Sequence, residues 1–290
     1  MRRLAATALA LVALSLWACA EPDPTDPTEV ELRWESEHLV LLGQEGAATM
    51  AEVQAIIAYG ESVFDPIATF LGRARVPNRK VEVLLMGTGS GRYVDDYGRI
   101  VLHRHSAALG GYLDAFAHEL THALRYDYWQ QHGTWGWPSF GFFEDGFAEL
   151  VALTVDPAKP GFPFFGFAED VVAGYWVTSG QAIPHDILRP RNQELNAPCD
   201  HQAYTQRASW FRYIDETYGR TTTLTMAYSP VEVTDAVTRD LIDRSLSELD
   251  AEWEEWITAR YAAIPNADSL ALAYRAWVPE TVVCVAGRDY

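Results

Sequence analysis

The first part of the chain alternates between two hydrophobic periods, one typical of strands and one typical of helices. Residues 30–42 alternate between apolar and polar positions, which predicts a strand or a hairpin. Residues 49–71 instead repeat apolar side chains three and four positions apart, which predicts one long helix with a kink at Pro66. The apolar positions of this helix are Val53, Ile56, Ile57, Val63, Ile67, Phe70 and Leu71.

Two short apolar runs and a second helical pattern come next. Residues 80–86 and 100–103 are rich in Val, Leu and Ile and predict two strands. Residues 112–128 return to helical spacing. The predicted order is strand, helix, strand, strand, helix, which indicates an α+β fold with a small mixed sheet.

The second half of the chain has a different pattern. Residues 138–198 are rich in Pro, Gly and Phe, which predicts an irregular segment interrupted by one helix at about residues 143–153. Residues 202–218 and 230–263 carry helical patterns. We therefore expect a domain over residues 30–200 followed by a mainly helical C-terminal lobe over residues 201–290.

The amino terminus has the composition of an export signal. Two arginines precede a short apolar run, so residues 1–18 are expected to be a signal peptide. The run ends in a sequence that resembles a bacterial lipobox, which implies lipidation of Cys19 and membrane attachment through that residue only. Cleavage after Ala20 is the alternative and would give a secreted protein. Residues 19–29 are acidic and rich in proline, as in an extended tether.

Charge and cysteine content narrow the range of partners. The formal net charge is −18, and a field of that sign repels phosphate backbones, so nucleic acid is excluded as a partner. Cys199 and Cys284 would remain after lipidation of Cys19. In an oxidising compartment two such cysteines favour a disulfide.

The candidate chemistry lies in the segment His118-Glu119-Leu120-Thr121-His122. Two histidines at positions i and i+4 of a helix lie about 40° apart around its axis and can share one metal ion. The glutamate after the first histidine stands beside the pair, where it can take a proton from water and pass it to a leaving group. The spacing therefore predicts a Zn²⁺ site with a general base.

The flanking positions of this helix support a packed arrangement. An apolar stripe should face the protein core while the two histidines and the glutamate line a cleft on the other side. The stripe consists of Leu113, Phe116, Ala117, Leu120 and Leu124.

Residues 117–123, followed by residues 143–149, resemble the gluzincin metallopeptidases, the clan of thermolysin and aminopeptidase N. The order of strands and helices is similar to that clan over roughly residues 30–225. The resemblance implies a zincin-like catalytic domain, a bound zinc ion and hydrolysis of peptide bonds. It also implies that an extended peptide adds to the strand at residues 100–104, taken as the edge of the sheet.

In this clan a glutamate before a glycine on a second helix supplies the third zinc ligand. The matching position here is Asp145, which is one methylene shorter, and its neighbour Glu144 is the alternative third ligand. Gly146 is expected to let this second helix approach the zinc helix closely. Glu149 resembles the carboxylate that orients a zinc histidine.

Tyr204 matches the place where aminopeptidase-like members carry a tyrosine, and its phenol could donate to the oxyanion of the reaction intermediate. His201 is a weaker candidate for the same role, because a lone loop histidine is more often a surface residue. His103 and His105 would share one face of a strand, but no carboxylate follows at a spacing that completes a metal site.

These features together predict a zinc metallopeptidase of the bacterial cell envelope that acts on a peptide or protein substrate as an endopeptidase or processing enzyme. Its predicted site comprises His118, His122 and Asp145 or Glu144 as ligands, with Glu119 and Tyr204 in the reaction. The alternative is a zinc-binding envelope lipoprotein that binds a peptide or a surface polymer without turnover, which the shortened Asp145 favours and the intact Glu119 opposes.

Overall fold

The structure is a computed structural model of the chain. It describes residues 32–44, 46–72, 80–88, 92–95, 98–104, 112–113, 115–132, 142–157, 164, 166–188, 197–229 and 233–276. The predicted signal peptide, the tether with Cys19, the predicted disulfide partner Cys284 and His105 lie outside these residues. The side chains of Cys199 and His201 are also outside the described part.

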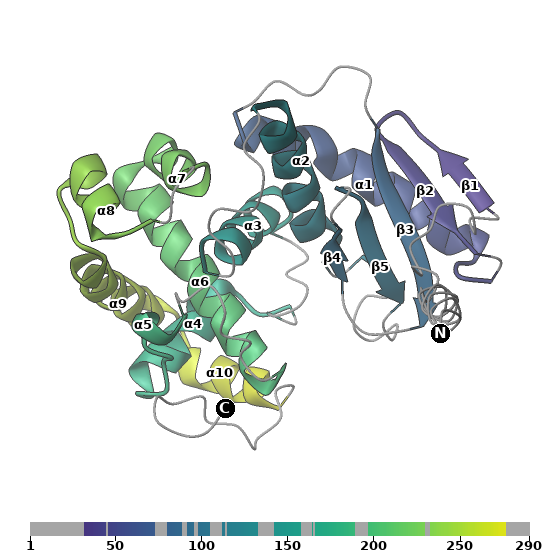
Figure 1. The fold of residues 1–290 in the computed structure, drawn as a ribbon. Helices are drawn as coiled ribbons and strands as arrows, with labels where there is room; N and C mark the ends of the chain where they lie inside the picture. The colour runs from purple at the N-terminus through teal and green to yellow at the C-terminus, as the bar shows by residue number, and fades with distance from the viewer. Residues whose placement is uncertain are drawn as a thin grey trace, which may run out of the picture.

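The strands form one mixed sheet in the order β1-β2-β3-β5-β4, shown on the right of Figure 1. Strands β1 (Leu32–Glu35) and β2 (Leu39–Gly43) pair antiparallel, so the hairpin is the observed one of the two predicted alternatives. Strand β2 pairs in parallel with β3 (Val81–Thr88), and β3 pairs in parallel with β5 (Ile100–Arg104). The α+β class expected from the sequence is confirmed.

The prediction for the sheet edge was wrong. Strand β5 lies between β3 and the short strand β4 (Arg92–Val94), which pairs antiparallel with its first three residues. A strand of three residues is too short to show an alternating hydrophobic pattern, so its presence could not be detected from the sequence. The edge of the described sheet on this side is therefore β4.

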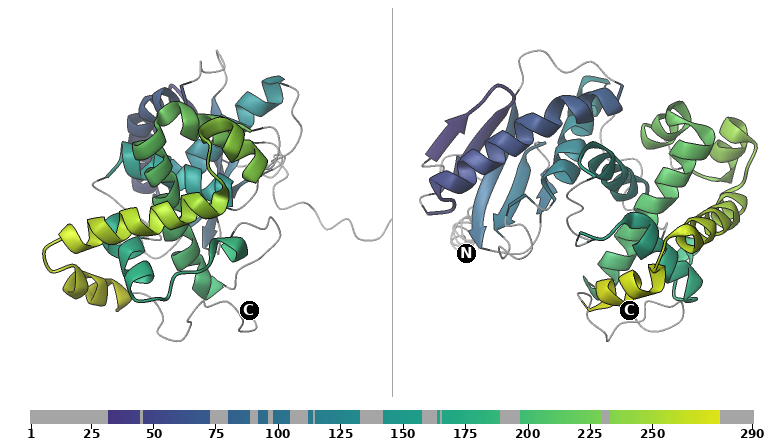
Figure 2. Two further views of the ribbon diagram at one scale, coloured as in Figure 1. Left: turned by 90° about the vertical axis from the view of Figure 1, so that its left-hand side faces the viewer. Right: turned by 180° about the vertical axis from the view of Figure 1, so that it is seen from behind.

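Helix α1 (Met50–Phe70) begins where the sequence analysis placed it and crosses one face of the sheet (Figure 2). The Thr49 hydroxyl accepts a hydrogen bond from the Glu52 amide while the Glu52 carboxylate accepts from the Thr49 amide, and this capping box satisfies two amides at the helix start. The helix continues through Pro66 to Phe70. Its buried face packs against Leu39, Leu41 and neighbouring strand residues in the main core.

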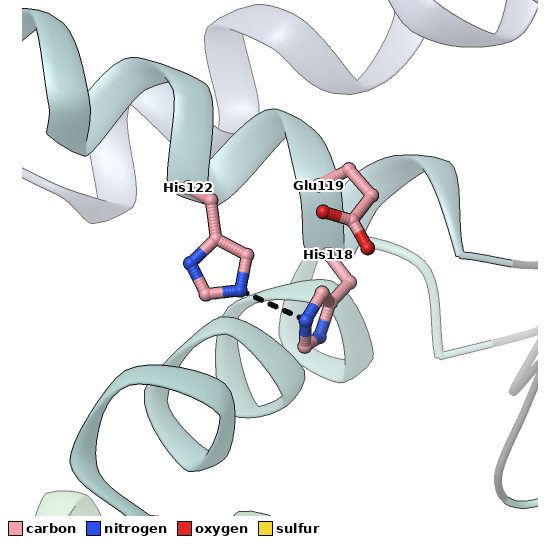
Figure 3. Close-up of side chains that lie close together, drawn as sticks. All are labelled: His118, Glu119 and His122. Atoms are coloured by element: carbon pink, nitrogen blue, oxygen red, sulfur yellow. Dashed lines mark hydrogen bonds between the residues drawn. The ribbon is translucent and has the colours of Figure 1, made fainter. Parts of the chain in front are cut away.

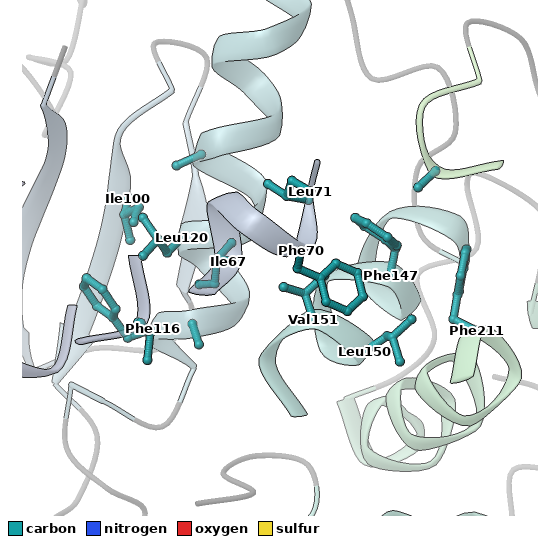
Figure 4. Close-up of a cluster of buried hydrophobic side chains, with 14 of the residues drawn as sticks. Ile67, Phe70, Leu71, Ile100, Phe116, Leu120, Phe147, Leu150, Val151 and Phe211 are labelled. Carbon is teal, nitrogen blue, oxygen red and sulfur yellow. The ribbon is translucent and has the colours of Figure 1, made fainter. Parts of the chain in front are cut away.

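Three further helices surround the candidate site: α2 (Phe116–His132), α3 (Phe142–Val155) and α6 (Ala197–Tyr218). Helix α2 begins four residues after its predicted start, because Tyr112 and Leu113 lie in a turn. Apolar side chains from α1, α2, α3, α6 and strand β5 form one buried cluster (Figure 4). Those labelled are Ile67, Phe70, Leu71, Ile100, Phe116, Leu120, Phe147, Leu150, Val151 and Phe211.

The remaining helices build the left-hand part of Figure 1. They are α4 (Glu169–Thr178), α5 (His185–Leu188), α7 (Arg220–Ala227), α8 (Asp235–Ile242), α9 (Leu246–Ala263) and α10 (Ala267–Arg275). Helix α4 falls in the segment predicted to be irregular. Most of its residues are buried, so it lacks the amphipathic period by which a surface helix is recognised.

Helix α6 runs through residue 200, where the sequence analysis placed a domain boundary. A single hydrophobic cluster joins the sheet, α1, α2 and α3 to residues of α6 and α9. The helical region therefore shares its core with the sheet region. No helix within the described ranges has the length and the apolar content needed to cross a membrane.

Candidate metal centre

Helix α2 carries the central motif, and its first half is buried around its whole circumference. The apolar stripe of Phe116, Ala117 and Leu120 packs into the core as predicted. On the side that carries the motif, which was expected to line a cleft, His118 and Glu119 are each only 5% exposed and His122 is 7% exposed. Charged and polar groups buried to this extent require partners.

The two imidazole rings meet at one pair of nitrogens (Figure 3). The Nε2 atoms of His118 and His122 lie 2.9 Å apart. The opposite nitrogens face carboxylates, because Nδ1 of His118 lies 2.9 Å from Glu149 and Nδ1 of His122 lies 2.8 Å from Glu144. A carboxylate at Nδ1 favours a proton on that nitrogen. The unprotonated Nε2 lone pairs then converge, as metal ligation requires.

Asp145 completes a triangle of donor atoms. Its Oδ1 lies 3.6 Å from Nε2 of His122 and 3.9 Å from Nε2 of His118. With the 2.9 Å separation of the two nitrogens, these sides define a point about 2.0 Å from all three atoms. Zinc binds imidazole nitrogen and carboxylate oxygen at about 2.0–2.2 Å, so this donor set fits a zinc ion.

Glu144 lies differently from its neighbour. Its Oε1 contacts Nδ1 of His122, the nitrogen on the far side of the ring from the convergence point, and also lies 2.9 Å from Nη1 of Arg125. Adjacent positions on a helix point about 100° apart. The two carboxylates that the sequence left as alternatives therefore occupy separate places, and only that of Asp145 faces both Nε2 atoms.

The charges around the two histidines do not balance without a cation. With both imidazoles neutral, four carboxylates and two guanidinium groups carry a formal charge of −2. These groups belong to Glu119, Glu144, Asp145, Glu149, Arg125 and Arg207. Uncompensated charge is costly to bury, so the cluster favours either two protons or one divalent cation.

The excess of negative charge also raises the pKa values of the two histidines. Burial lowers the pKa of His122, but the carboxylates of Asp145 and Glu144 outweigh burial and raise that pKa to about 10. Burial also lowers the pKa of His118, which Glu149 raises above its ordinary value. A field that stabilises protons at these nitrogens also stabilises a metal cation there.

Glu119 stands next to the convergence point. It offers a carboxylate oxygen within 4.8 Å of the ligand atoms of both histidines. Burial raises the pKa of Glu119, while the charges of His118 and His122 oppose the change. A carboxylate with a raised pKa that is close to a metal is suited to accept and return a proton.

Tyr204 lies near the two histidines and belongs to α6, whereas the resemblance implied a tyrosine that precedes a helix. Its ring centroid lies 5.9 Å from that of His118. The charge of Asp145, together with burial, raises the pKa of Tyr204 well above its ordinary value. The phenol therefore keeps its proton at neutral pH and can act as a hydrogen-bond donor.

Gly146 has a different role from the one predicted. A Cβ atom at this position would lie 2.9 Å from Cβ of Arg207 and 3.0 Å from its carbonyl oxygen. The glycine thus allows α3 to approach α6, whereas the sequence analysis expected it to allow approach to the zinc helix. A glycine on a helix indicates close approach of another part of the chain, but which element approaches depends on how the helices pack.

Two buried arginines at the site were not among the predicted site residues. Arg125 is fully buried on α2, three residues after His122, and Arg207 is buried on α6, three residues after Tyr204. Residues three apart on a helix share a face, so both could have been suspected from their spacing to the predicted site residues.

A second group of possible metal ligands consists of Glu37 and His38 between β1 and β2 and Glu61 on α1. Hydrogen bonds within the protein explain why these side chains lie together. Glu61 accepts hydrogen bonds from the Ser36 hydroxyl, the His38 amide and the His38 ring, so its oxygens are already engaged. The third member, Glu37, has a side chain 78% exposed. His103, considered above for a second metal, belongs to neither of the two groups of described residues that could hold a metal ion.

No protein-family model matches this chain, and no curated protein matches its sequence.

Proposed function

We propose that this protein is a zinc-dependent peptidase whose ligands are His118, His122 and Asp145. The observation that carries the proposal is the convergence of two Nε2 atoms and Oδ1 of Asp145 about one point, with Glu119 beside it. The formal charge of the surrounding groups supports a divalent ion. The resemblance of residues 117–123 and 143–149 to gluzincins supports the reaction class.

Zinc bound at this point would polarise a peptide carbonyl and lower the pKa of water. Glu119 takes a proton from the attacking water and delivers it to the departing amine. Tyr204 donates a hydrogen bond to the oxygen of the scissile carbonyl as negative charge develops on it. Glu144 holds the imidazole ring of His122 through a hydrogen bond at Nδ1, and the charge of Glu149, 2.9 Å from Nδ1 of His118, favours a proton on that nitrogen. Both Nε2 atoms then keep their lone pairs.

The resemblance and the edge of the sheet support a peptide or protein substrate. Strand β4 forms the described edge and packs close to α2, so an extended peptide can pair with its outer side. We propose an endopeptidase or processing enzyme of the bacterial cell envelope, tethered by a lipid on Cys19 or secreted. Backbone pairing fixes the register of a substrate and leaves its sequence preference to side-chain contacts.

The decisive experiment uses protein produced from residue 20 onward, with zinc content and cleavage of a peptide library measured on the same sample. One zinc per chain together with peptide cleavage is the expected result. Glu119→Gln keeps the shape of the side chain and removes the base. It should retain zinc and lose about 10²- to 10⁴-fold in turnover.

His118→Ala and His122→Ala should lose both zinc and turnover. Undiminished cleavage by Glu119→Gln would mean that the activity arises elsewhere. Zinc binding with no cleavage of any peptide would favour the alternative of a binding protein without turnover. A chain that binds no metal would refute both functions.

A further inference from the structure

Arg207 contacts the candidate ligand Asp145 from the side away from the histidines. Its Nη1 lies 3.4 Å from Oδ2 of Asp145, and its Nη2 donates a hydrogen bond of 3.3 Å to the carbonyl oxygen of Leu188. Arg207 is 6% exposed. The guanidinium is therefore held at two of its nitrogens between the end of α5 and the candidate site.

The two oxygens of Asp145 face different partners. Oδ1 lies 3.6 Å from Nε2 of His122 and 3.9 Å from Nε2 of His118, whereas Oδ2 lies 3.4 Å from Nη1 of Arg207. A carboxylate bonded on one oxygen cannot rotate freely about its Cβ–Cγ bond. Arg207 thus holds the plane of the carboxylate with one oxygen directed at the convergence point, as ligation through a single oxygen requires.

Close packing of α3 on α6 makes this contact possible. Gly146, the residue after Asp145, lies so near the backbone of Arg207 that an added Cβ would be 3.0 Å from its carbonyl carbon. Such separations are below ordinary van der Waals contact. The glycine brings the base of the arginine side chain against the residue next to the ligand.

We propose that Arg207 is a positioning residue that makes the short side chain of Asp145 an effective metal ligand. The inference rests on the proposed function insofar as the site holds a metal. An aspartate is one methylene shorter than the glutamate of the resembling family, so its oxygen depends more on the placement of α3 and on the direction of its carboxylate. Arg207 supplies that direction.

A purely electrostatic role for Arg207 predicts the opposite result. Removing a positive charge beside a cation site reduces repulsion and should strengthen metal binding. Removing a group that orients a ligand should weaken metal binding, typically by about 10- to 100-fold. The sign of the change in zinc affinity therefore separates positioning from a role in charge alone.

The test measures zinc dissociation constants with a competing chelator for the wild type, Arg207→Gln and Arg207→Lys. We expect Arg207→Gln to bind zinc about 10- to 100-fold more weakly. Arg207→Lys should lie between it and the wild type, because an ammonium keeps the charge without the forked geometry. Visible absorption of the cobalt(II)-substituted proteins should change in both variants, since it reports the geometry of the metal ligands.

Arg212→Gln provides the matched control on the same helix. Arg212 contacts Glu169 and Glu216 and none of the candidate ligands, so its variant should keep the zinc affinity and cobalt spectrum of the wild type. Zinc affinity in Arg207→Gln equal to or above that of the wild type would overturn the proposal. Should that variant fail to fold, an unchanged affinity and spectrum in Arg207→Lys would overturn it equally.

The outcomes also separate this inference from the function. Wild-type protein that binds zinc without cleaving peptides would refute the peptidase while leaving the zinc affinities to decide the role of Arg207. Wild-type protein that binds no metal would refute both.

Discussion

Helix α6 takes part in two clusters of charge whose balance differs. Arg207 joins the candidate metal centre, where six charged groups leave a formal charge of −2 around two neutral imidazoles. Arg212, five residues later, joins a cluster between α4, α6 and α9 with a formal charge of −1. That second cluster consists of Glu169, Asp170, Arg212, Glu216 and Arg260.

The excess negative charge of the two clusters can be neutralised in different ways. In the second cluster burial raises the pKa of Glu169 to about 7 even though Arg212 opposes the shift, so one proton can neutralise the excess carboxylate. Its arginines and Glu216 are about one third exposed, and water screens them. In the first cluster the deficit falls on two nitrogens 2.9 Å apart, which a single divalent ion can satisfy. Ion pairs alone do not indicate a metal site. Excess negative charge around two converging nitrogen lone pairs indicates a candidate metal site.

The largest expected effect is on zinc affinity and distinguishes the two adjacent carboxylates of the candidate metal centre. Asp145→Ala removes an oxygen that faces both Nε2 atoms, so zinc affinity should fall by several orders of magnitude. Glu144→Ala removes only the partner of Nδ1 of His122 and should cost about 10- to 100-fold. Dissociation constants from chelator competition rank the two variants.

The reverse ranking would contradict this division of roles. If Glu144→Ala lost the metal and Asp145→Ala stayed near the wild type, Glu144 would be the ligand and the donor triangle would have to be rebuilt around it.

The next largest effect is on the free energy of unfolding, and it contrasts the buried Arg125 with the partly exposed Arg260. Arg125 lies 2.9 Å from Glu144 and is fully buried, so Arg125→Met breaks a buried ion pair and leaves Glu144 with His122 as its remaining cationic partner. We expect a loss of about 3–5 kcal/mol in the free energy of unfolding, measured with urea on metal-free protein. The control Arg260→Gln breaks the ion pairs of a 31% exposed side chain with Asp170 and Glu216, which water screens, and should cost less than Arg125→Met. Similar losses in both variants would remove the energetic distinction between the clusters.

The smallest effect concerns the pH dependence of the second cluster. Because the pKa of Glu169 in the folded protein, about 7, lies above its ordinary value of 4.5, the folded state binds a proton more tightly than the unfolded state. This contribution to stability is complete below about pH 4.5 and is lost as the pH rises through 7. Glu169→Gln mimics the protonated side chain and should be more stable than the wild type at pH 8 by up to about 3 kcal/mol.

Urea midpoints of both proteins between pH 4.5 and pH 8 measure this difference. Comparing the two proteins removes the contribution of the histidines, which they share. A constant difference across that range would show that Glu169 does not titrate there upon unfolding.

Much of the fold could be predicted from local patterns. The first strand region follows from a period of two residues, and α1 follows from a period of 3.6 residues to within one residue of its start. Strands β3 and β5 follow from short runs rich in Val, Leu and Ile. Helix α4 and strand β4 could not be predicted in this way. The first is buried on most sides and the second has only three residues, so neither displays a period.

The sequence by itself determined which groups of α2 converge. Residues four apart on a helix lie on one face whatever the helix packs against, so the placing of His118 beside His122 with Glu119 adjacent needed no further information. The sequence also showed that Glu144 and Asp145 point in different directions, since helix geometry separates neighbours by about 100°.

Only the tertiary structure decided which of the two carboxylates faces the histidines. That choice depends on the rotation of α3 relative to α2, which no pattern within one helix contains. Packing brings Gly146 against the backbone of Arg207 on α6, and Arg125 engages Glu144 from α2. These contacts join positions 61 and 19 residues apart, and they exist only because the three helices enclose one buried group of charges.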